Sequence, residues 1–239
     1  SLAKPVWGFL ADRIDHRIAV SEQSRETATR HHGGEYELIP NGVLIPERAE
    51  PGGREHRIVF AGRHEPRKGL QVLLRAWPEI HSRTGARLRV AGAEPMAVRL
   101  LLARLRVSEE GIDILGFLSQ EELTAELLAA KALVAPSLGG ESFGMVLTRA
   151  FACATPVVAS DIPGYRGVME QSVGVLVPPG DPRALAEAVE ELLADEPRRE
   201  QLGRAARELA ISKYSWDDIA GQLTEIYEGL AAGRVKVAA

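Results

Sequence analysis

Short apolar runs alternate with amphipathic stretches at helical spacing along most of this chain, and this alternation constrains the fold more than any other feature. The pattern predicts strands at Arg17–Val20, Tyr36–Ile39, Arg57–Ala61, Arg87–Ala91, Ile112–Leu115, Ala132–Ala135, Pro156–Ala159 and Gly174–Val177. It predicts helices at Leu70–His81, Met96–Leu105, Gln120–Ala130, Met145–Cys153, Pro182–Ala194 and Trp216–Leu230. Such alternation is typical of the α/β class, in which a parallel sheet carries helices on both faces.

A polar stretch rich in proline and glycine, "PERAEPGGRE" at residues 46–55, predicts a linker. The α/β domain then occupies residues 56–213, and a C-terminal helix and tail follow at 214–239. The segment 1–45 contains only two expected strands and is too small to bury a core of its own. We expect it to be the end of a preceding domain whose larger part is missing.

The composition excludes several classes of protein. A net charge of −4 gives no reason to expect nucleic-acid binding, and 45% hydrophobic content is typical of a globular chain of 239 residues. No apolar stretch approaches the roughly 20 residues that span a bilayer, and no secretion signal opens the sequence. We expect a cytoplasmic protein, with a peripheral position at the inner membrane face left open. The single cysteine, Cys153, excludes an internal disulfide and is expected to be a buried small hydrophobe.

The segment "APSLGGESFGMVLTRAFACATPVVAS", residues 135–160, combines a strand, a glycine loop, a helix and a second strand. This arrangement directs backbone N–H groups and a helix N-terminus at an anion. Gly139, Gly140 and Gly144 allow a ligand to approach the main chain closely. A lone glycine loop is most simply a tight turn in an α/β core, but the acid within it, Glu141, favours a ligand site.

A second loop, in "VFAGRHEPRKGL", places Arg63 and Lys68 after the strand at 57–61. Ligands of open α/β sheets bind at the carboxyl ends of the strands, and two cations there suit a diphosphate. The alternative is a solvated basic loop. Arg67 is expected to be the solvated cation of the three, and His64 is either a phosphate contact or a surface residue.

Five segments together resemble the retaining glycosyltransferases of the GT-B fold, the glycosyl transferases group 1. They are "PNGV" at 40–43, "AGRHEPRKG" at 61–69, "GFLSQEEL" at 116–123, the glycine–glutamate loop, and "YSWDDIAGQLTEIYE" at 214–228. The loop is most similar to that of bacterial phosphatidylinositol mannosyltransferases, which use GDP-mannose. The resemblance implies a Rossmann-like, nucleotide-sugar-binding C-terminal domain. It also implies that Ala11–Ile39 holds the last strands and helix of an N-terminal acceptor domain.

The resemblance also implies roles for single residues. Arg63 and Lys68 would bind the donor diphosphate, and Glu141 would hydrogen-bond the transferred sugar. Backbone N–H groups around Phe143, Gly144 and Met145 would receive sugar and phosphate oxygens. The remaining implied contacts to the donor are Gly116, Phe117 and Leu118 beside the nucleobase, and Gly140 and Ser142 in the glycine loop. No cofactor is implied, and the lack of an Asp-x-Asp element favours cations over a metal at the diphosphate.

Arg149 departs from the family pattern, which places a second glutamate eight positions after the first to bind the ribose hydroxyls. Arginine only donates hydrogen bonds and carries the opposite charge. Three interpretations stay open: a weakened donor site, an altered donor, or a side chain turned elsewhere with water in its place. Ala154 stands where the family has glycine, and we expect a simple packing difference there.

The predicted function is retaining transfer of a hexose, most consistent with mannose from GDP-mannose, to a lipid or glycan acceptor. A UDP-hexose is the other candidate donor. Acceptor residues would lie in the missing N-terminal part, so this chain should bind donor but turn over poorly. The alternatives are a nucleotide-sugar epimerase of the same fold and a non-catalytic nucleotide-sugar-binding module. Adjacent His31 and His32 do not predict a metal site, because neighbouring helix positions point to different faces.

Overall fold

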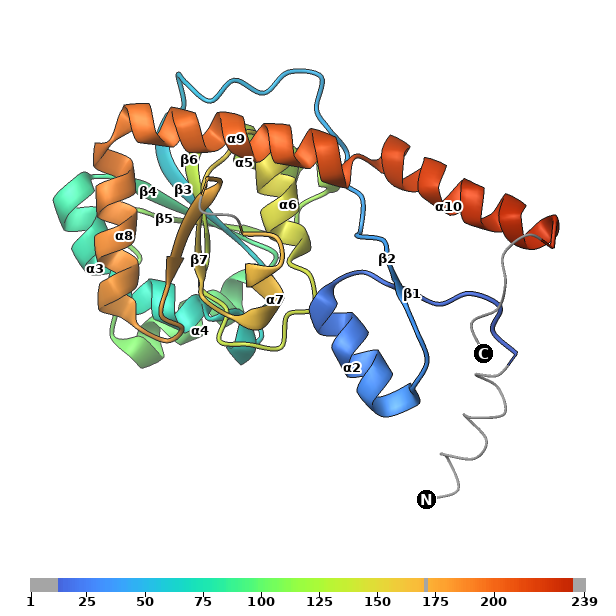
Figure 1. Ribbon diagram of the computed structural model, residues 1–239. Helices are drawn as coiled ribbons and strands as arrows, with labels where there is room; N and C mark the ends of the chain where they lie inside the picture. Colours follow the sequence, from blue (N-terminus) through green and yellow to red (C-terminus); the bar gives the residue numbers. More distant parts are fainter. Residues whose placement is uncertain (1–12, 170–171, 234–239) are drawn as a thin grey trace.

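A six-stranded parallel sheet forms the centre of the molecule, as the alternating pattern predicts (Figure 1). The computed structural model describes residues 13–169 and 172–233, so residues 1–12 of the 1–45 segment and residues 234–239 of the tail lie outside the described residues. The strand order is β5-β4-β3-β6-β7-β8. The strands are β3 (Glu55–Ala61), β4 (Arg87–Ala91), β5 (Ile112–Gly116), β6 (Ala130–Ala135), β7 (Val157–Ser160) and β8 (Gly174–Val177).

Helices cover both faces of this sheet, which confirms the predicted α/β class. One face packs against α3 (Leu70–Thr84), α4 (Pro95–Leu105) and α8 (Pro182–Ala194). The other packs against α5 (Gln120–Ala129), α6 (Met145–Ala152) and α9 (Glu196–Tyr214). Side chains of β3 alternate between the two cores, with Ile58 and Phe60 on the first face and Val59 on the second.

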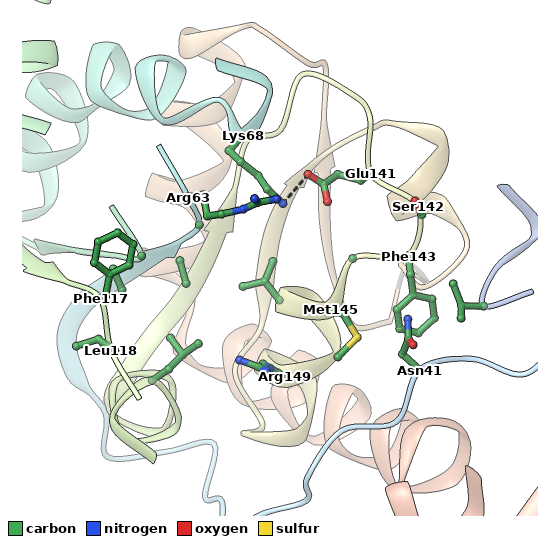
Figure 2. Close-up of a pocket in the computed structure, with 18 residues that line it drawn as sticks. Asn41, Arg63, Lys68, Phe117, Leu118, Glu141, Ser142, Phe143, Met145 and Arg149 are labelled. Carbon is green, nitrogen blue, oxygen red and sulfur yellow. Dashed lines mark ion pairs between the residues drawn. The ribbon is translucent and has the colours of Figure 1, made fainter. Parts of the chain in front are cut away.

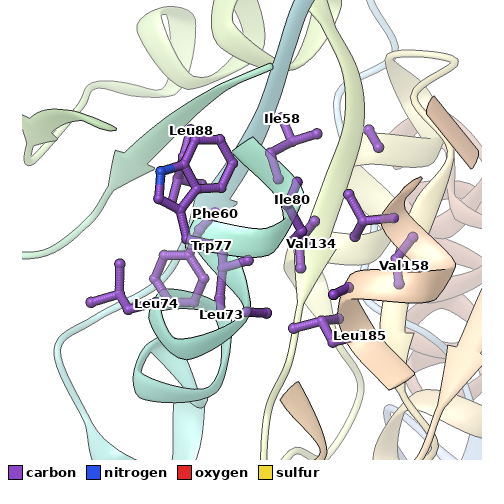
Figure 3. Close-up of a cluster of buried hydrophobic side chains, with 14 of the residues drawn as sticks. Ile58, Phe60, Leu73, Leu74, Trp77, Ile80, Leu88, Val134, Val158 and Leu185 are labelled. Atoms are coloured by element: carbon purple, nitrogen blue, oxygen red, sulfur yellow. The ribbon is translucent and has the colours of Figure 1, made fainter. Parts of the chain in front are cut away.

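The first core contains the largest buried side chain, Trp77 of α3, surrounded by aliphatic residues from β3, β4, β6 and α8 (Figure 3). Its indole N–H donates to the carbonyl of Glu110 at 2.9 Å, so burial leaves no unpaired donor on the ring. Dense packing of this kind fixes α3 on the sheet. The loop that precedes α3 is thereby held at the carboxyl ends of the strands.

Arg54, from the segment predicted as a linker, fastens that segment to the domain. Its guanidinium donates to the carbonyls of Leu127 and Ala130 at 2.9 and 3.0 Å, and to those of Cys153 and Ala154 at 2.7 and 3.0 Å. These carbonyls lie at or just beyond the C-terminal ends of α5 and α6, where a cation is favourable. Burial lowers the pKa of Arg54 to about 10, so the group is charged at neutral pH.

The N-terminal part of the described chain forms a separate small unit of two parallel strands, β1 (Ile18–Ala19) and β2 (Glu37–Leu38), joined by α2 (Glu22–His32). The backbone N–H of Val43 donates to the carbonyl of Tyr214 at 2.7 Å, and that of Trp216 donates to the carbonyl of Val43 at 3.3 Å. The chain therefore leaves this unit beside the start of α10 (Trp216–Ala231). The domain boundaries at 45, 55 and 213 stay predictions.

Two short helices and one backbone conformation differ from the expectations. The 3-10 helix η1 (Pro66–Lys68) and the helix α7 (Pro163–Arg166) are too short to show a helical period in sequence. Ala154 has a φ of 52°, the left-handed region that favours glycine. The expectation of a simple packing difference at Ala154 is therefore wrong, because the substitution places a side chain in a strained backbone.

Candidate functional site

A cavity of about 740 Å³ opens at the carboxyl ends of the central strands (Figure 2). Loops that follow β3, β4, β5 and β6 supply most of its walls, which is where open α/β sheets bind ligands. The structure brings ten of the predicted residues to it: Arg63, Lys68, Phe117, Leu118, Glu141, Ser142, Phe143, Gly144, Met145 and Arg149. Gly116 and Gly140 lie on the same turns, next to lining residues.

Val20 and Asn41 also line the cavity and were not predicted. Both come from the part of the chain before the α/β domain. Asn41 belongs to the "PNGV" segment that contributed to the family resemblance, so the signal was present in the sequence without a role attached. The small N-terminal unit therefore forms part of the wall of the candidate site.

Glu141 is held by cations from the loop after β3. Lys68 Nζ and Arg67 Nη1 each lie 2.7 Å from Glu141 Oε1, and the carboxylate side chain is only 10% exposed. The expectation that Arg67 is a solvated cation is therefore wrong. The tight turn of η1 directs Arg67 toward the glycine loop, where it also donates to the carbonyl of Gly140 at 3.0 Å.

Gly69 makes this contact between the two loops possible. Its φ is 71°, and a Cβ built there would lie 1.8 Å from the carbonyl oxygen of Pro136, so no other residue fits. The adjacent backbone N–H of Leu138 donates to the carbonyl of Arg67 at 2.7 Å. Close approach of the two backbones therefore sets the position of Lys68 against Glu141.

Residues of α7 and of the loop before the glycines support Glu141 from behind, and sequence analysis missed them. A Cβ on Gly164 would lie 1.8 Å from the backbone oxygen of Glu141, so glycine is required there too. The Tyr165 hydroxyl lies 2.7 Å from Ser137 Oγ, which donates to Glu141 Oε1 at 3.4 Å. Burial raises the pKa of Tyr165, so its hydroxyl stays protonated. The Pro-Gly pair at 163–164 was the available signal for a turn.

The N-terminus of α6 points into the cavity without a side-chain cap. Its N-cap is Gly144, with a φ of 91° and no side-chain hydrogen bond to the first turn. Met145 and Val146 of that turn line the cavity, so their backbone N–H groups are available to an anion. Arg63 lies on the same cavity with its side chain 72% exposed and pairs with Glu65 at 3.0 Å.

The opposite part of the cavity is apolar apart from one cation. Phe117, 72% exposed, lies with Leu118 and Leu123 on this wall. The Arg149 side chain is half-buried and makes no hydrogen bond or ion pair with a residue of the described ranges. A flat apolar group fits beside Phe117, whereas an anion fits beside Lys68 and the start of α6.

Other sites considered from the sequence have simple structural explanations. His31 and His32 are exposed in the last turn of α2. Within residues 13–169 and 172–233 no group of three or more His, Cys, Asp or Glu residues could hold a metal ion. Cys153 is buried, as predicted, and burial raises its thiol pKa to about 11. None of the helices in the described ranges is long and apolar enough to cross a bilayer.

A parallel sheet with helices on both faces and a cavity at the carboxyl ends of its strands is the architecture of the GT-B glycosyltransferase class. Comparison with known sequences agrees. The model of the family "Glycosyl transferases group 1" matches residues 45–209, and the chain belongs to this family. A phosphatidyl-myo-inositol mannosyltransferase of Mycobacterium leprae is 36% identical over 236 residues, which cover 95% of this chain and 62% of the relative. The corresponding protein of Mycobacterium tuberculosis is 33% identical over 240 residues, with the same coverage of both chains.

Solved structures share the fold. Sucrose-phosphate synthase from Thermosynechococcus elongatus superposes with a TM-score of 0.82 at 27% identity, covering 97% of this chain and 61% of that one. HepE from Anabaena, solved with UDP and glucose, superposes with a TM-score of 0.80 at 22% identity, covering 95% and 67% of the two chains. The chain thus spans 62% of the length of the mannosyltransferases cited above, and their full activity does not transfer to it directly.

Proposed function

We propose that this chain is the donor-binding part of a retaining hexosyltransferase and that it binds a nucleotide sugar, GDP-mannose, in the 740 Å³ cavity. One observation carries the proposal. Lys68, which can bind a phosphate, lies 2.7 Å from Glu141, which can bind sugar hydroxyls, and both line the same cavity as the uncapped start of α6. A diphosphate joined to a sugar needs these two kinds of group side by side.

Each part of the donor has a matching part of the cavity. Arg63, Lys68 and the backbone N–H groups around Phe143, Gly144 and Met145 hold the diphosphate. The second carboxylate oxygen of Glu141 accepts hydrogen bonds from sugar hydroxyls, with Gly140 and Ser142 adjoining it. The nucleobase lies along the turn of Gly116, Phe117 and Leu118. The relatives named as mannosyltransferases support mannose, and UDP-hexose is the other donor to test.

The chemistry asked of this chain is stabilisation of the leaving group. When the bond between the anomeric carbon and the diphosphate oxygen breaks, negative charge grows on that oxygen, and Arg63, Lys68 and α6 are placed to neutralise it. No residue of the described cavity is suited to act as a general base toward an acceptor. We propose that acceptor groups lie in a further N-terminal part, of which residues 1–45 are the end, and that the acceptor is a lipid or glycan.

We also propose that transfer does not require a metal. Arg63, Lys68 and the N-terminus of α6 would supply the positive charge at the diphosphate. We further propose that the protein is cytoplasmic. If its acceptor is a phosphatidylinositol, as the names of the relatives indicate for those proteins, it would act peripherally at the inner membrane face, because that acceptor is a membrane component.

Isothermal titration calorimetry of this chain with GDP-mannose, UDP-glucose, GDP and UDP tests the proposal. We expect micromolar binding of GDP-mannose and GDP, weaker binding of the uridine ligands, and little transfer to water or lipid. Binding of none of the four ligands would refute the proposal. Efficient transfer by this chain alone would refute the assignment of acceptor groups to a further part, and conversion of the sugar without acceptor would identify an epimerase.

A further inference from the structure

The helix α4 is apolar on its outer side as well as on the side that faces the core. Only two of its residues, both arginines, are polar. Val98 and Leu102 are buried in the first core. On the outer side Met96 and Leu100 are 57% and 64% exposed, and Ala103 is exposed beside them. A helix that is apolar all round is normally buried all round. This outer side, here called the α4 face, is left uncovered by the residues that the structure describes.

A groove of about 320 Å³ beside the α4 face carries unpaired positive charge. It lies between the loop after β3, α3 and α4, and its lining includes His64, Arg75 of α3, Leu101 and Arg104. Both arginines are exposed, and neither side chain makes a hydrogen bond or an ion pair with a described residue. Arg104 comes four positions after Leu100, so these two side chains are neighbours on the helix surface. The groove therefore continues the α4 face with two free cations.

The acids that line the groove or contact α4 already have partners. Glu65 pairs with two arginines of its own loop, at 3.0 and 2.7 Å. Glu109 pairs with Arg99 of α4 at 3.3 Å. The carboxylate of Glu94 caps the start of α4 by accepting a backbone N–H at 2.8 Å. The charge of the two groove arginines is thus available to an anionic partner.

Exposed apolar side chains flanked by free cations match the surface of an anionic phospholipid membrane. The apolar side of an interfacial helix enters the boundary between headgroups and acyl chains, and anionic lipids attract the cations beside it. Arginine can reach a lipid phosphate while its hydrocarbon stem lies along the apolar surface. A second copy of the chain fits this face less well, because a two-fold contact would bring the same unpaired arginines near each other.

The α4 face lies next to the donor cavity. The helix begins at Pro95, shortly after Ala91 and Gly92, which line that cavity. The turn that carries Phe117 packs on the same end of the helix, since a Cβ on Gly116 would lie 3.7 Å from Pro95 Cγ. A membrane in contact with the α4 face would therefore lie close to the bound donor.

We propose that the α4 face and the groove beside it dock this chain on the surface of an anionic phospholipid membrane. Met96 and Leu100 enter the interface between headgroups and acyl chains, and Arg75 and Arg104 bind lipid phosphates. This inference rests on the proposed function, in which the acceptor is a membrane lipid, and it names the surface that brings the donor cavity to that acceptor.

Co-sedimentation with two kinds of vesicle tests the proposal: phosphatidylcholine alone, and phosphatidylcholine mixed with phosphatidylinositol. We expect binding to the mixed vesicles to be tighter by about tenfold or more, and to weaken as salt is added. Arg104→Gln should weaken it about fivefold, the contribution of one cation near an anionic surface. Leu100→Gln should weaken it about tenfold through lost apolar burial. Arg198→Gln and Ile211→Gln change exposed residues of α9, on the opposite face of the sheet, and should bind like the native chain.

Several outcomes would overturn the inference. These are no binding to either vesicle, equal binding to both, or equal losses in the α9 controls. If Leu100→Gln lowers the mass of the chain in sedimentation equilibrium and leaves vesicle binding intact, the α4 face joins two copies instead. Thermal unfolding of each variant shows whether the fold is retained, and Arg104→Gln, a change at an exposed side chain without partners, provides a second test.

Calorimetry with GDP separates this inference from the proposed function. Leu100 and Arg104 lie outside the donor cavity, so Leu100→Gln and Arg104→Gln should bind GDP like the native chain while they lose vesicle binding. Failure of the native chain to bind any nucleotide would refute the donor site. Vesicle binding is measured without nucleotide, so its result decides on the α4 face in either case.

Discussion

Lys68 Nζ lies 2.7 Å from Glu141 Oε1, and this ion pair joins the two loops that form the candidate donor site. Arg67 reaches the same oxygen at 2.7 Å, so one carboxylate oxygen serves two cations. The second oxygen remains for a ligand. A bound diphosphate would compete with Glu141 for Lys68, and the carboxylate would keep Arg67 as its partner.

The two members of the ion pair should affect binding in opposite ways. Lys68→Ala should weaken GDP binding by about 10- to 100-fold, since a hydrogen bond to a charged group contributes about 1.5–3 kcal/mol. Glu141→Gln should leave GDP binding unchanged or tighter, because it removes negative charge beside the phosphates, and should weaken GDP-mannose relative to GDP. Calorimetry with both ligands measures this, with Arg75→Gln as control. Equal losses for both ligands in Glu141→Gln would contradict the sugar-binding role.

Gly69 and Gly85 provide a matched test of the contact between the loops. Both have a left-handed φ, 71° and 67°, but a Cβ at Gly85 meets nothing within 4 Å, whereas at Gly69 it meets the Pro136 carbonyl. Gly85→Ala should cost about 1 kcal/mol of unfolding free energy from backbone strain. Gly69→Ala should cost about 2 kcal/mol more, because the loops must separate. Urea unfolding of both variants checks the difference, and equal costs would show that the approach of the loops is not tight.

Arg106 and Ala154 both have left-handed backbone, but glycine should stabilise the fold mainly at Arg106. Arg106 is exposed at the C-terminal end of α4 with a φ of 57°, and Arg106→Gly should stabilise the fold by about 1 kcal/mol. Ala154 has a φ of 52° but is buried, so Ala154→Gly loses a packed methyl group worth about 0.8 kcal/mol and should gain little. Thermal unfolding of both variants should show the larger rise in Tm for Arg106→Gly. The reverse order would contradict the strain argument.

Cys153 should make stability decline at alkaline pH. Burial raises its pKa from 9.0 to about 11, so the folded chain holds the thiol proton where the unfolded chain releases it. The contribution is complete below pH 9 and is lost as the pH rises from 9 to about 11, by about 3 kcal/mol in all. Chemical unfolding across this window should show the decline in the native chain and a smaller one in Cys153→Ala. An equal decline in the free energy of unfolding for the two proteins would show that Cys153 is not the cause of the pH dependence.

Most of the sheet and both loops of the site could be predicted from the sequence, because strands buried on both faces and glycine-rich turns leave local signals. The strand Arg87–Ala91 and the helix Pro182–Ala194 have the predicted bounds. Arg67 could not be placed, since its partner Glu141 is distant in sequence and the 3-10 helix that contains Arg67 is too short to show a helical period. The strain at Ala154 was equally hidden, because a φ value depends on the complete path of the chain.

The adjacent backbone contacts of Val43 with Tyr214 and Trp216 have a mechanical consequence. The chain leaves the small N-terminal unit near residue 43 and passes from α9 to α10 near residue 215, and these two segments are hydrogen-bonded to each other. The bonds of Val43 with Tyr214 and Trp216 therefore form one pivot for the small N-terminal unit. A further contact between the small unit and the sheet domain lies far from these bonds along the chain: Ser21 Oγ donates to the carbonyl of Ser142 at 2.5 Å. Rotation of the small N-terminal unit about the bonds at Val43 would therefore displace the loop that carries Glu141.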